Sequence, residues 1–160
     1  MKEIRGTFDA RGRRFAIVAA QFNDVVVSKL LDGAVAAFRS HGIAEDDLIV
    51  VWVPGAFELP LTARRLAAAG LHDAVVCLGA VVRGETAHFD YVADVAASGI
   101  REASADTGIP VVFGVLTTDA LDQAMARAGG DHGNKGWDAA VAGLEMASLL
   151  ERIGKGGEAR

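Results

Sequence analysis

A polar turn at residues 83–88 holds the side chains of this sequence that are best suited to chemistry. Arg83-Gly84-Glu85-Thr86 follows an apolar run, and His88 comes two residues later. Gly84 lets the backbone approach a ligand, and Thr86 can cap a helix whose first N–H groups favour a phosphate. His88 would place a proton donor and acceptor beside that anion. The turn therefore indicates either a phosphate site with acid–base chemistry or, more simply, a capped helix followed by a surface histidine.

The spacing of apolar residues places this turn between a strand and a helix. The uninterrupted apolar run at 74–82 is typical of a strand that is buried on both faces. From Phe89 onward, apolar residues recur three and four positions apart, which predicts a helix with one buried face that ends near residue 108. The turn would then lie at the carboxyl end of the strand, which is where open parallel sheets bind ligands.

Strands and helices are predicted to alternate along the rest of the chain. Three further buried strands are predicted at residues 15–20, 48–53 and 111–116. Helices are predicted over residues 24–41, 57–69 and 118–128, and from residue 137 to about 153. Asn23 or Asp24 would cap the first of these helices. This order predicts an α/β fold: a flavodoxin-like three-layer sandwich whose four-stranded parallel sheet has the order 2-1-3-4, with helices on both faces.

The two ends of the chain and one glycine-rich stretch are predicted to be less regular. Residues 1–13 are expected to form an arm with a candidate edge strand at 4–8. Residues 129–136 are expected to form a flexible loop, and residues 154–160 a disordered tail. Because no repeat or linker divides the chain, residues 1–160 are expected to form a single domain.

Composition excludes several classes of protein and of site. The net charge is −5 and the largest basic cluster is Arg11-Gly12-Arg13-Arg14, so nucleic acid and anionic membranes are poor partners. The chain has no run of ~20 apolar residues and no signal-peptide core at its N-terminus, which predicts a cytoplasmic protein. Cys77, the only cysteine, is expected to be buried and inert. The four histidines lack metal-ligand spacing, so no metal site is predicted.

Unusual residues follow each of the four predicted strands. They are Phe22-Asn23, residues 55–58, residues 83–88 and residues 117–119. Because the carboxyl ends of parallel strands share one rim of a sheet, we expect all four groups to meet in one pocket. This convergence favours a ligand site over four unrelated loops.

Five motifs give the sequence a resemblance to a known family. They are Gln21-Phe22-Asn23, PGAFELP at 54–60, GAVVRGETAHFDY at 79–91, FGVLT at 113–117 and GNKGWD at 133–138. From Phe15 to about Leu150, the chain resembles the lumazine synthases of riboflavin biosynthesis. The resemblance implies a transferase that condenses 5-amino-6-(D-ribitylamino)uracil with 3,4-dihydroxy-2-butanone 4-phosphate to 6,7-dimethyl-8-ribityllumazine. Phosphate and water would be released, and neither a metal nor an organic cofactor would be needed.

The resemblance also implies roles for individual residues. His88 would transfer protons, and Phe22 would stack on the pyrimidine ring. Glu85 and Thr86 would bind the phosphate through main-chain N–H groups, together with the side chain of Arg127. The other substrate-binding candidates are Asn23, Ala56, Phe57, Glu58, Ala80, Val81, Val82, Phe113 and Lys135. Asp138 stands where many relatives carry glutamate and is a candidate supporting residue.

Members of this family form oligomers, so the resemblance implies partners of the same chain. Phe113 would cover the ligand from an adjacent subunit, which places complete active sites at subunit interfaces. A homopentamer is expected. The loop at 129–136 has no insertion, as in members that form icosahedral capsids of sixty subunits, although Gly130-Asp131 departs from the pattern of those members. Riboflavin synthase is a further candidate partner.

Three other functions occur as alternatives for a chain of this fold class. A flavin- or nucleotide-binding module would need a hydroxyl- and glycine-rich phosphate loop after the first strand, where this chain has Gln21-Phe22-Asn23-Asp24. A riboflavin synthase that joins two lumazine molecules would have no use for the phosphate-binding candidates. A non-catalytic shell or scaffold protein that binds lumazine or riboflavin is compatible with the sequence.

Overall fold

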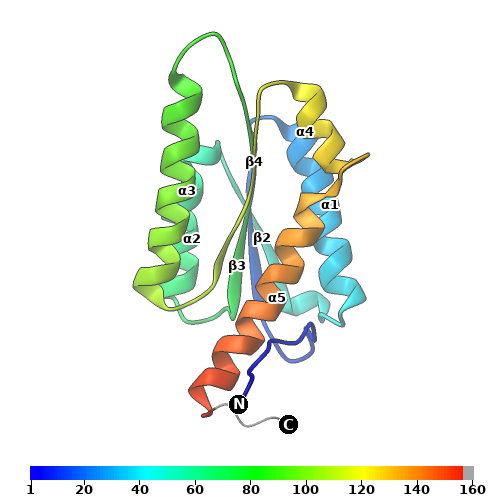
Figure 1. Ribbon diagram of the computed structural model, residues 1–160, viewed down its shortest axis with the longest axis vertical. Helices are drawn as coiled ribbons and strands as arrows, with labels where there is room; N and C mark the ends of the chain where they lie inside the picture. The colour runs from blue at the N-terminus through cyan, green and yellow to red at the C-terminus, as the bar shows by residue number, and fades with distance from the viewer. Residues whose placement is uncertain (157–160) are drawn as a thin grey trace.

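A four-stranded parallel sheet forms the middle layer of the computed structural model, which describes residues 1–156 (Figure 1). The strands are β1 (Phe15–Ala20), β2 (Leu48–Val53), β3 (Ala74–Val82) and β4 (Val111–Thr118). They lie in the order β2-β1-β3-β4, which confirms the predicted sheet. The pairing of β1 with β3 ends at Ala19 and Leu78, so Gly79–Val82 extend beyond the paired part of β3. This overhang leaves one side of the end of β3 free of a neighbouring strand.

Helices cover both faces of the sheet (Figure 1). Helices α2 (Leu59–Ala68) and α3 (His88–Thr107) lie on one face, and α1 (Asp24–Ser40), α4 (Leu121–Arg127) and α5 (Lys135–Gly154) lie on the other. Right-handed crossovers produce this division, because the chain moves to one side of β1 through α1 and to the other side through α2 and α3. Alternate residues of β1 therefore enter different cores: Phe15 packs beneath α1 and α5, and Ala16 beneath α2 and α3.

Helices α1 and α5 approach each other closely at the start of α5. A Cβ atom on Gly136 would overlap the backbone carbonyl of Leu30. Asn134 links the two helices near this contact. Its Nδ2 donates to the carbonyl of Lys29 in α1 at 2.9 Å. Its Oδ1 accepts from the N–H groups of Gly136 and Trp137 in α5 at 2.8 and 3.2 Å. This cap starts α5 at Lys135, two residues earlier than predicted.

Several boundaries differ from the predictions. The candidate edge strand at 4–8 is wrong, since these residues form no strand. The expected loop at 129–136 contains a short antiparallel pair, β5 (Ala128–Gly130) and β6 (Gly133–Asn134). The chain also forms two short 3-10 helices, η1 (Glu45–Asp47) and η2 (Ala56–Glu58). The predicted tail begins at the last residue of α5, and residues 157–160 lie outside the described residues.

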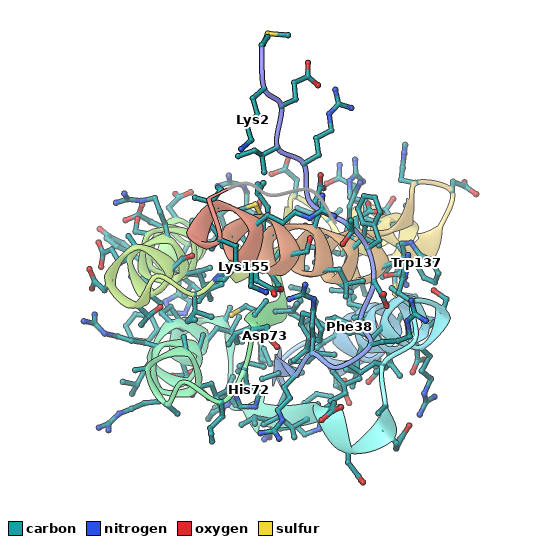
Figure 2. All side chains as sticks on the ribbon, turned by 90° about the horizontal axis from the view of Figure 1, so that it is seen from below. Lys2, Phe38, His72, Asp73, Trp137 and Lys155 are labelled. Atoms are coloured by element: carbon teal, nitrogen blue, oxygen red, sulfur yellow. The ribbon has the colours of Figure 1, made fainter. Side chains whose placement is uncertain are left out.

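The N-terminal arm is fixed on the helices of its own chain. Figure 2 shows it passing over α5; Trp137 marks the start of this helix, and Lys155 directly follows its end. The N–H of Thr7 donates to Ser148 Oγ at 2.6 Å, and the N–H of Ala10 donates to the carbonyl of His41 at 2.9 Å. These bonds give main-chain N–H groups of the arm the hydrogen-bond partners that a paired strand would otherwise supply.

Candidate functional site

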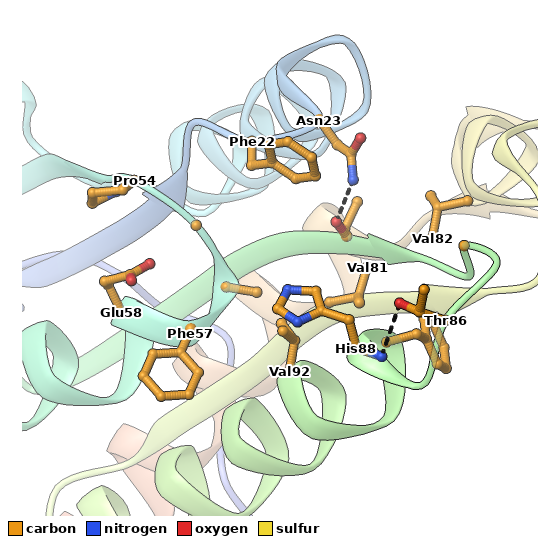
Figure 3. Close-up of a pocket in the computed structure, with 15 residues that line it drawn as sticks. Phe22, Asn23, Pro54, Phe57, Glu58, Val81, Val82, Thr86, His88 and Val92 are labelled. Atoms are coloured by element: carbon orange, nitrogen blue, oxygen red, sulfur yellow. Dashed lines mark hydrogen bonds between the residues drawn. The ribbon is translucent and has the colours of Figure 1, made fainter.

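A cavity of about 720 Å³ lies beyond the carboxyl end of β1 (Figure 3). This is the point at which the chain connections leave β1 and β3 toward opposite faces, so the sheet itself opens a crevice there. Three segments wall the cavity: the turn after β1, the turn after β2, and the chain from the end of β3 into α3. Its lining residues are Phe22, Asn23, Pro54, Gly55, Ala56, Phe57, Glu58, Ala80, Val81, Val82, Gly84, Thr86, His88, Phe89 and Val92.

The cavity brings together three of the four predicted segments, and the expectation that all four meet in one pocket is wrong. Residues 117–119, which follow β4, line other cavities. The physical reason is the direction of the chain: α4 follows β4 on the face opposite to α3 (Figure 1). The fourth segment is therefore carried away from the crevice between β1 and β3.

Phe22 is presented to the cavity by an unusual backbone. Its N–H donates to the carbonyl of Pro54 at 3.0 Å, and the ring is 73% exposed. The next residue, Asn23, has a φ of 61° and is the one positive-φ residue other than glycine in residues 1–156. Its Nδ2 donates to the carbonyl of Ala80 at 2.7 Å (Figure 3). Asn23 thus occupies the N-cap position of α1, but its side chain fastens the turn to β3 instead of capping the helix as predicted.

Replacing Asn23 separates the cost of the left-handed backbone from the cost of the hydrogen bond. Asn23→Gly loses only the bond to Ala80, whereas Asn23→Ala also places a Cβ in a conformation that non-glycine residues avoid. We expect Asn23→Ala to be less stable than Asn23→Gly by about 1 kcal/mol in urea unfolding. At Ser28, an exposed position inside α1, the order should reverse, with alanine above glycine. Equal stability of the two Asn23 variants would contradict the strained turn.

The turn after β2 contributes a carboxylate and an aromatic ring. Glu58 is half-buried, and its N–H closes the turn on the carbonyl of Gly55 at 3.2 Å. A Cβ on Gly55 would lie 3.3 Å from Glu58 Oε2, so the glycine leaves room for the carboxylate. Phe57 is 56% exposed and adds an apolar surface beside it. The turn can therefore accept hydrogen bonds from a polyhydroxyl chain while it covers apolar parts of a ligand.

His88 begins α3, and its ring projects into the cavity (Figure 3). Its N–H donates to Thr86 Oγ1 over a long distance of 3.4 Å, while Ala87 occupies the N-cap position, so Thr86 is at best a weak cap. The N–H groups of Gly84, Glu85 and Thr86 donate no hydrogen bond to any described residue. Free N–H groups ahead of a long helix are suited to an anion. Glu85 itself does not line the cavity, whereas Thr86 does.

The remaining predicted residues lie together elsewhere. Phe113, Arg127, Lys135 and Asp138 line a second cavity of about 430 Å³ along β4, which is an edge strand of the sheet. Lys135 Nζ and Asp138 Oδ2 are 3.0 Å apart, so Asp138 pairs with Lys135 and shares no cavity with His88. Arg127 is half-buried, and Phe113 is 43% exposed. Within one chain, this second set is thus separate from the first cavity.

Some residues of the cavity wall carry no sequence signal that marks them as site residues. The apolar spacing from Phe89 onward predicts only a buried helix face, yet Phe89 and Val92 also line the cavity. Their apolar spacing could not reveal this second role, because the same pattern describes a core and a pocket wall. Pro54, which directly follows β2, is a further wall residue.

The remaining observations concern the cysteine, metal ions and membrane-spanning helices. Cys77 is fully buried in β3, and burial raises the pKa of its thiol, which confirms the expected buried cysteine. Within residues 1–156, no cluster of three histidine, cysteine or acidic side chains is arranged to hold a metal ion. In the same part of the chain, no helix is long and apolar enough to cross a bilayer.

A family model described as 6,7-dimethyl-8-ribityllumazine synthase matches residues 12–151. The matched range includes the whole sheet and all the residues that line the two cavities described above. The resemblance noted in the sequence therefore extends over both sets of candidate site residues.

Proposed function

The chain belongs to the 6,7-dimethyl-8-ribityllumazine synthase family, and we propose that it catalyses the reaction for which this family is named. The substrates are 5-amino-6-(D-ribitylamino)uracil and 3,4-dihydroxy-2-butanone 4-phosphate. The products are the lumazine, inorganic phosphate and water. Family membership supports a transferase of riboflavin biosynthesis, and the cavity supports the finer assignment.

The proposed reaction consists of condensation steps that require proton transfers. The aromatic amine attacks the ketone and forms an imine with loss of water. The phosphate then leaves by β-elimination, and the enol that remains tautomerises to a new carbonyl. The ribitylamino nitrogen closes the ring on this carbonyl with loss of another water. His88 is the one imidazole in the cavity and can move protons in each step. Holding two small reactants together contributes as much or more, on the order of 7–11 kcal/mol at best.

The observation that carries the proposal is the arrangement of three features in one cavity. Phe22 offers an exposed ring that can stack on a flat heterocycle, which is worth about 1 kcal/mol beyond burial. The free N–H groups of residues 84–86 can receive the phosphate. His88 lies at the end of that loop and points into the same space. Each feature matches one part of the two substrates: the pyrimidine, the phosphate and the reacting carbonyl.

The direct test supplies purified protein with both substrates and follows fluorescence of the product together with release of inorganic phosphate. The expected result is equimolar formation of lumazine and phosphate that requires both substrates. A protein that binds the lumazine but forms none would overturn the proposal in favour of a non-catalytic shell or scaffold. Lumazine consumption with formation of riboflavin would instead favour a riboflavin synthase.

We also infer that the second set of residues completes the cavity of a neighbouring copy of the chain. The inference is supported by the open edge of β4, on which Phe113 is exposed, and by the cations Arg127 and Lys135 beside it. A cation near the free N–H groups of residues 84–86 would complete a phosphate site. The resemblance implies that these residues share an active site with His88, whereas within one chain they line a separate cavity. A pentamer supplies such interfaces, and light scattering distinguishes it from a closed shell.

Mixed oligomers test this shared site. His88→Ala damages the cavity face and Arg127→Ala damages the edge of β4, so each variant alone should have little activity. Coexpressed chains that mix randomly should regain activity at about a quarter of their sites, because an intact cavity face meets an intact edge there. Separately purified oligomers that are combined without subunit exchange are the control and should show no gain. Absence of any gain in the coexpressed mixture would place the complete site within one chain.

A further inference from the structure

Arg83 begins the exposed loop that leads to His88, and its side chain returns to the end of that loop. The guanidinium carbon lies 4.4 Å from the centre of the Phe89 ring, and Nη1 lies 3.6 Å from Asp90 Oδ1. Phe89 and Asp90 belong to the first turn of α3. One side chain thus connects the two ends of the segment that carries Gly84, Thr86 and His88.

Arg83 is also anchored at the end of the neighbouring strand, β4, through both its side chain and its main chain. Arg83 Nε donates to Asp119 Oδ1 at 2.9 Å, and the N–H of Arg83 donates to the carbonyl of Thr118 at 2.8 Å. Asp119 directly follows β4, whose pairing with β3 ends at Thr118 and Val82. The hydrogen bond to Asp119 and the two nearby carboxylates raise the pKa of Arg83, so its charge is constant at all ordinary pH values.

The direction of the side chain separates Arg83 from the residues that line the cavity. Gly84, Thr86, His88 and Phe89 line the 720 Å³ cavity, and Arg83 does not. Arg83 lines a smaller cavity of about 320 Å³ with Asp119 and Phe89. Its donors are directed at two carboxylates, so an anion in the main cavity would have to compete with both of them.

We propose that Arg83 is a positioning residue that holds the 84–88 loop in its binding conformation and is not itself a ligand of the phosphate. It acts by bridging Asp119, beyond β4, to the first turn of α3. The proposal rests on the proposed function for the role of the loop, but the bridging itself concerns only this chain. Because misplacement of a reacting group by about 1 Å can cost 10²-fold in rate, a loosened loop should be measurable in the kinetics.

The two possible roles of Arg83 predict opposite effects of Asp119→Asn. If Arg83 positions the loop through Asp119, this change loosens the loop and raises the KM for the phosphorylated substrate several-fold. If Arg83 binds the phosphate, the change removes a competing carboxylate and the KM falls or stays constant. Asp119 lines neither of the cavities assigned to substrate, so a direct contact does not complicate its effect.

Steady-state kinetics on the assembled protein provide the first readout. We expect Arg83→Met to raise the KM for the phosphorylated substrate about tenfold, with a smaller fall in kcat. Arg83→Lys should be only partly better, because lysine keeps the charge but loses the planar fork and the stacking on Phe89. The double variant Arg83→Met with Asp119→Asn should be no worse than Arg83→Met alone. The matched control is Arg64→Met, which removes an exposed ion pair with Asp106 at 2.9 Å and should change neither constant.

Amide hydrogen exchange provides a readout that does not depend on activity. Faster exchange confined to residues 84–90 in Arg83→Met and in Asp119→Asn would support the proposal. Unchanged exchange in both variants, a lower or unchanged KM in Asp119→Asn, or wild-type constants in Arg83→Met would each overturn it. An inactive wild-type protein would overturn the proposed function instead, and the exchange measurement would then decide alone whether Arg83 holds the loop.

Discussion

His88→Ala is expected to lower kcat by about 10²–10⁴-fold while it leaves measurable activity, because proton transfer is one contribution and positioning is another. The ring projects into the cavity from the first turn of α3, and its loss leaves the free N–H groups of residues 84–86 in place. Binding of the phosphorylated substrate should therefore change less than kcat. Initial rates of lumazine formation at saturating substrate measure the effect, and added imidazole should restore part of the activity.

His72→Ala is the matched control for this prediction. His72 lies in the turn before β3, at the end of the sheet opposite to the cavity, so kcat should not change (Figure 2). A correctly assembled His88→Ala protein with no activity at all would contradict the view that positioning supplies much of the rate. An unchanged kcat would remove His88 from its proposed role.

The second large effect is expected from Gly136→Ala, which should lower the free energy of unfolding by about 3 kcal/mol or more. The added Cβ would overlap the carbonyl of Leu30, a backbone atom that cannot move without shifting α1. The shift would also disturb the Asn134 side chain, which caps α5 and donates to the carbonyl of Lys29. Urea unfolding followed by circular dichroism measures the loss, and a low yield of soluble protein would agree with it.

Gly154→Ala is the control in the same helix. It has open space around its Cα, so alanine should be neutral or stabilising by up to about 1 kcal/mol. If Gly136→Ala were as stable as the wild type, the close approach of α1 and α5 would be wrong. Loss of stability at both positions would indicate a general intolerance of α5, not a contact at Gly136.

The fold was largely predictable because its signals are local. Residues 74–82 are apolar without interruption, and a strand that is covered by helices on both faces requires this pattern. Predictions were wrong where one local sequence pattern is compatible with two different structures. Asn23 is a good capping residue, but its amide donates to Ala80, which is far away in the sequence. Residues 4–8 fit an edge strand, yet the arm contains Thr7, which bonds to Ser148 on α5.

The sequence by itself determined the order of strands and helices, the family, and most of the candidate site residues. These follow from periodicity and motifs, which the chain carries locally. Only the tertiary structure decided which candidates share a cavity. Phe22, Glu58 and His88 meet because three strand ends surround one crevice, whereas Phe113 and Arg127 lie along the edge of β4. The physical reason is that a loop's position depends on which face of the sheet the next helix covers, and that is fixed by the packing of the whole chain.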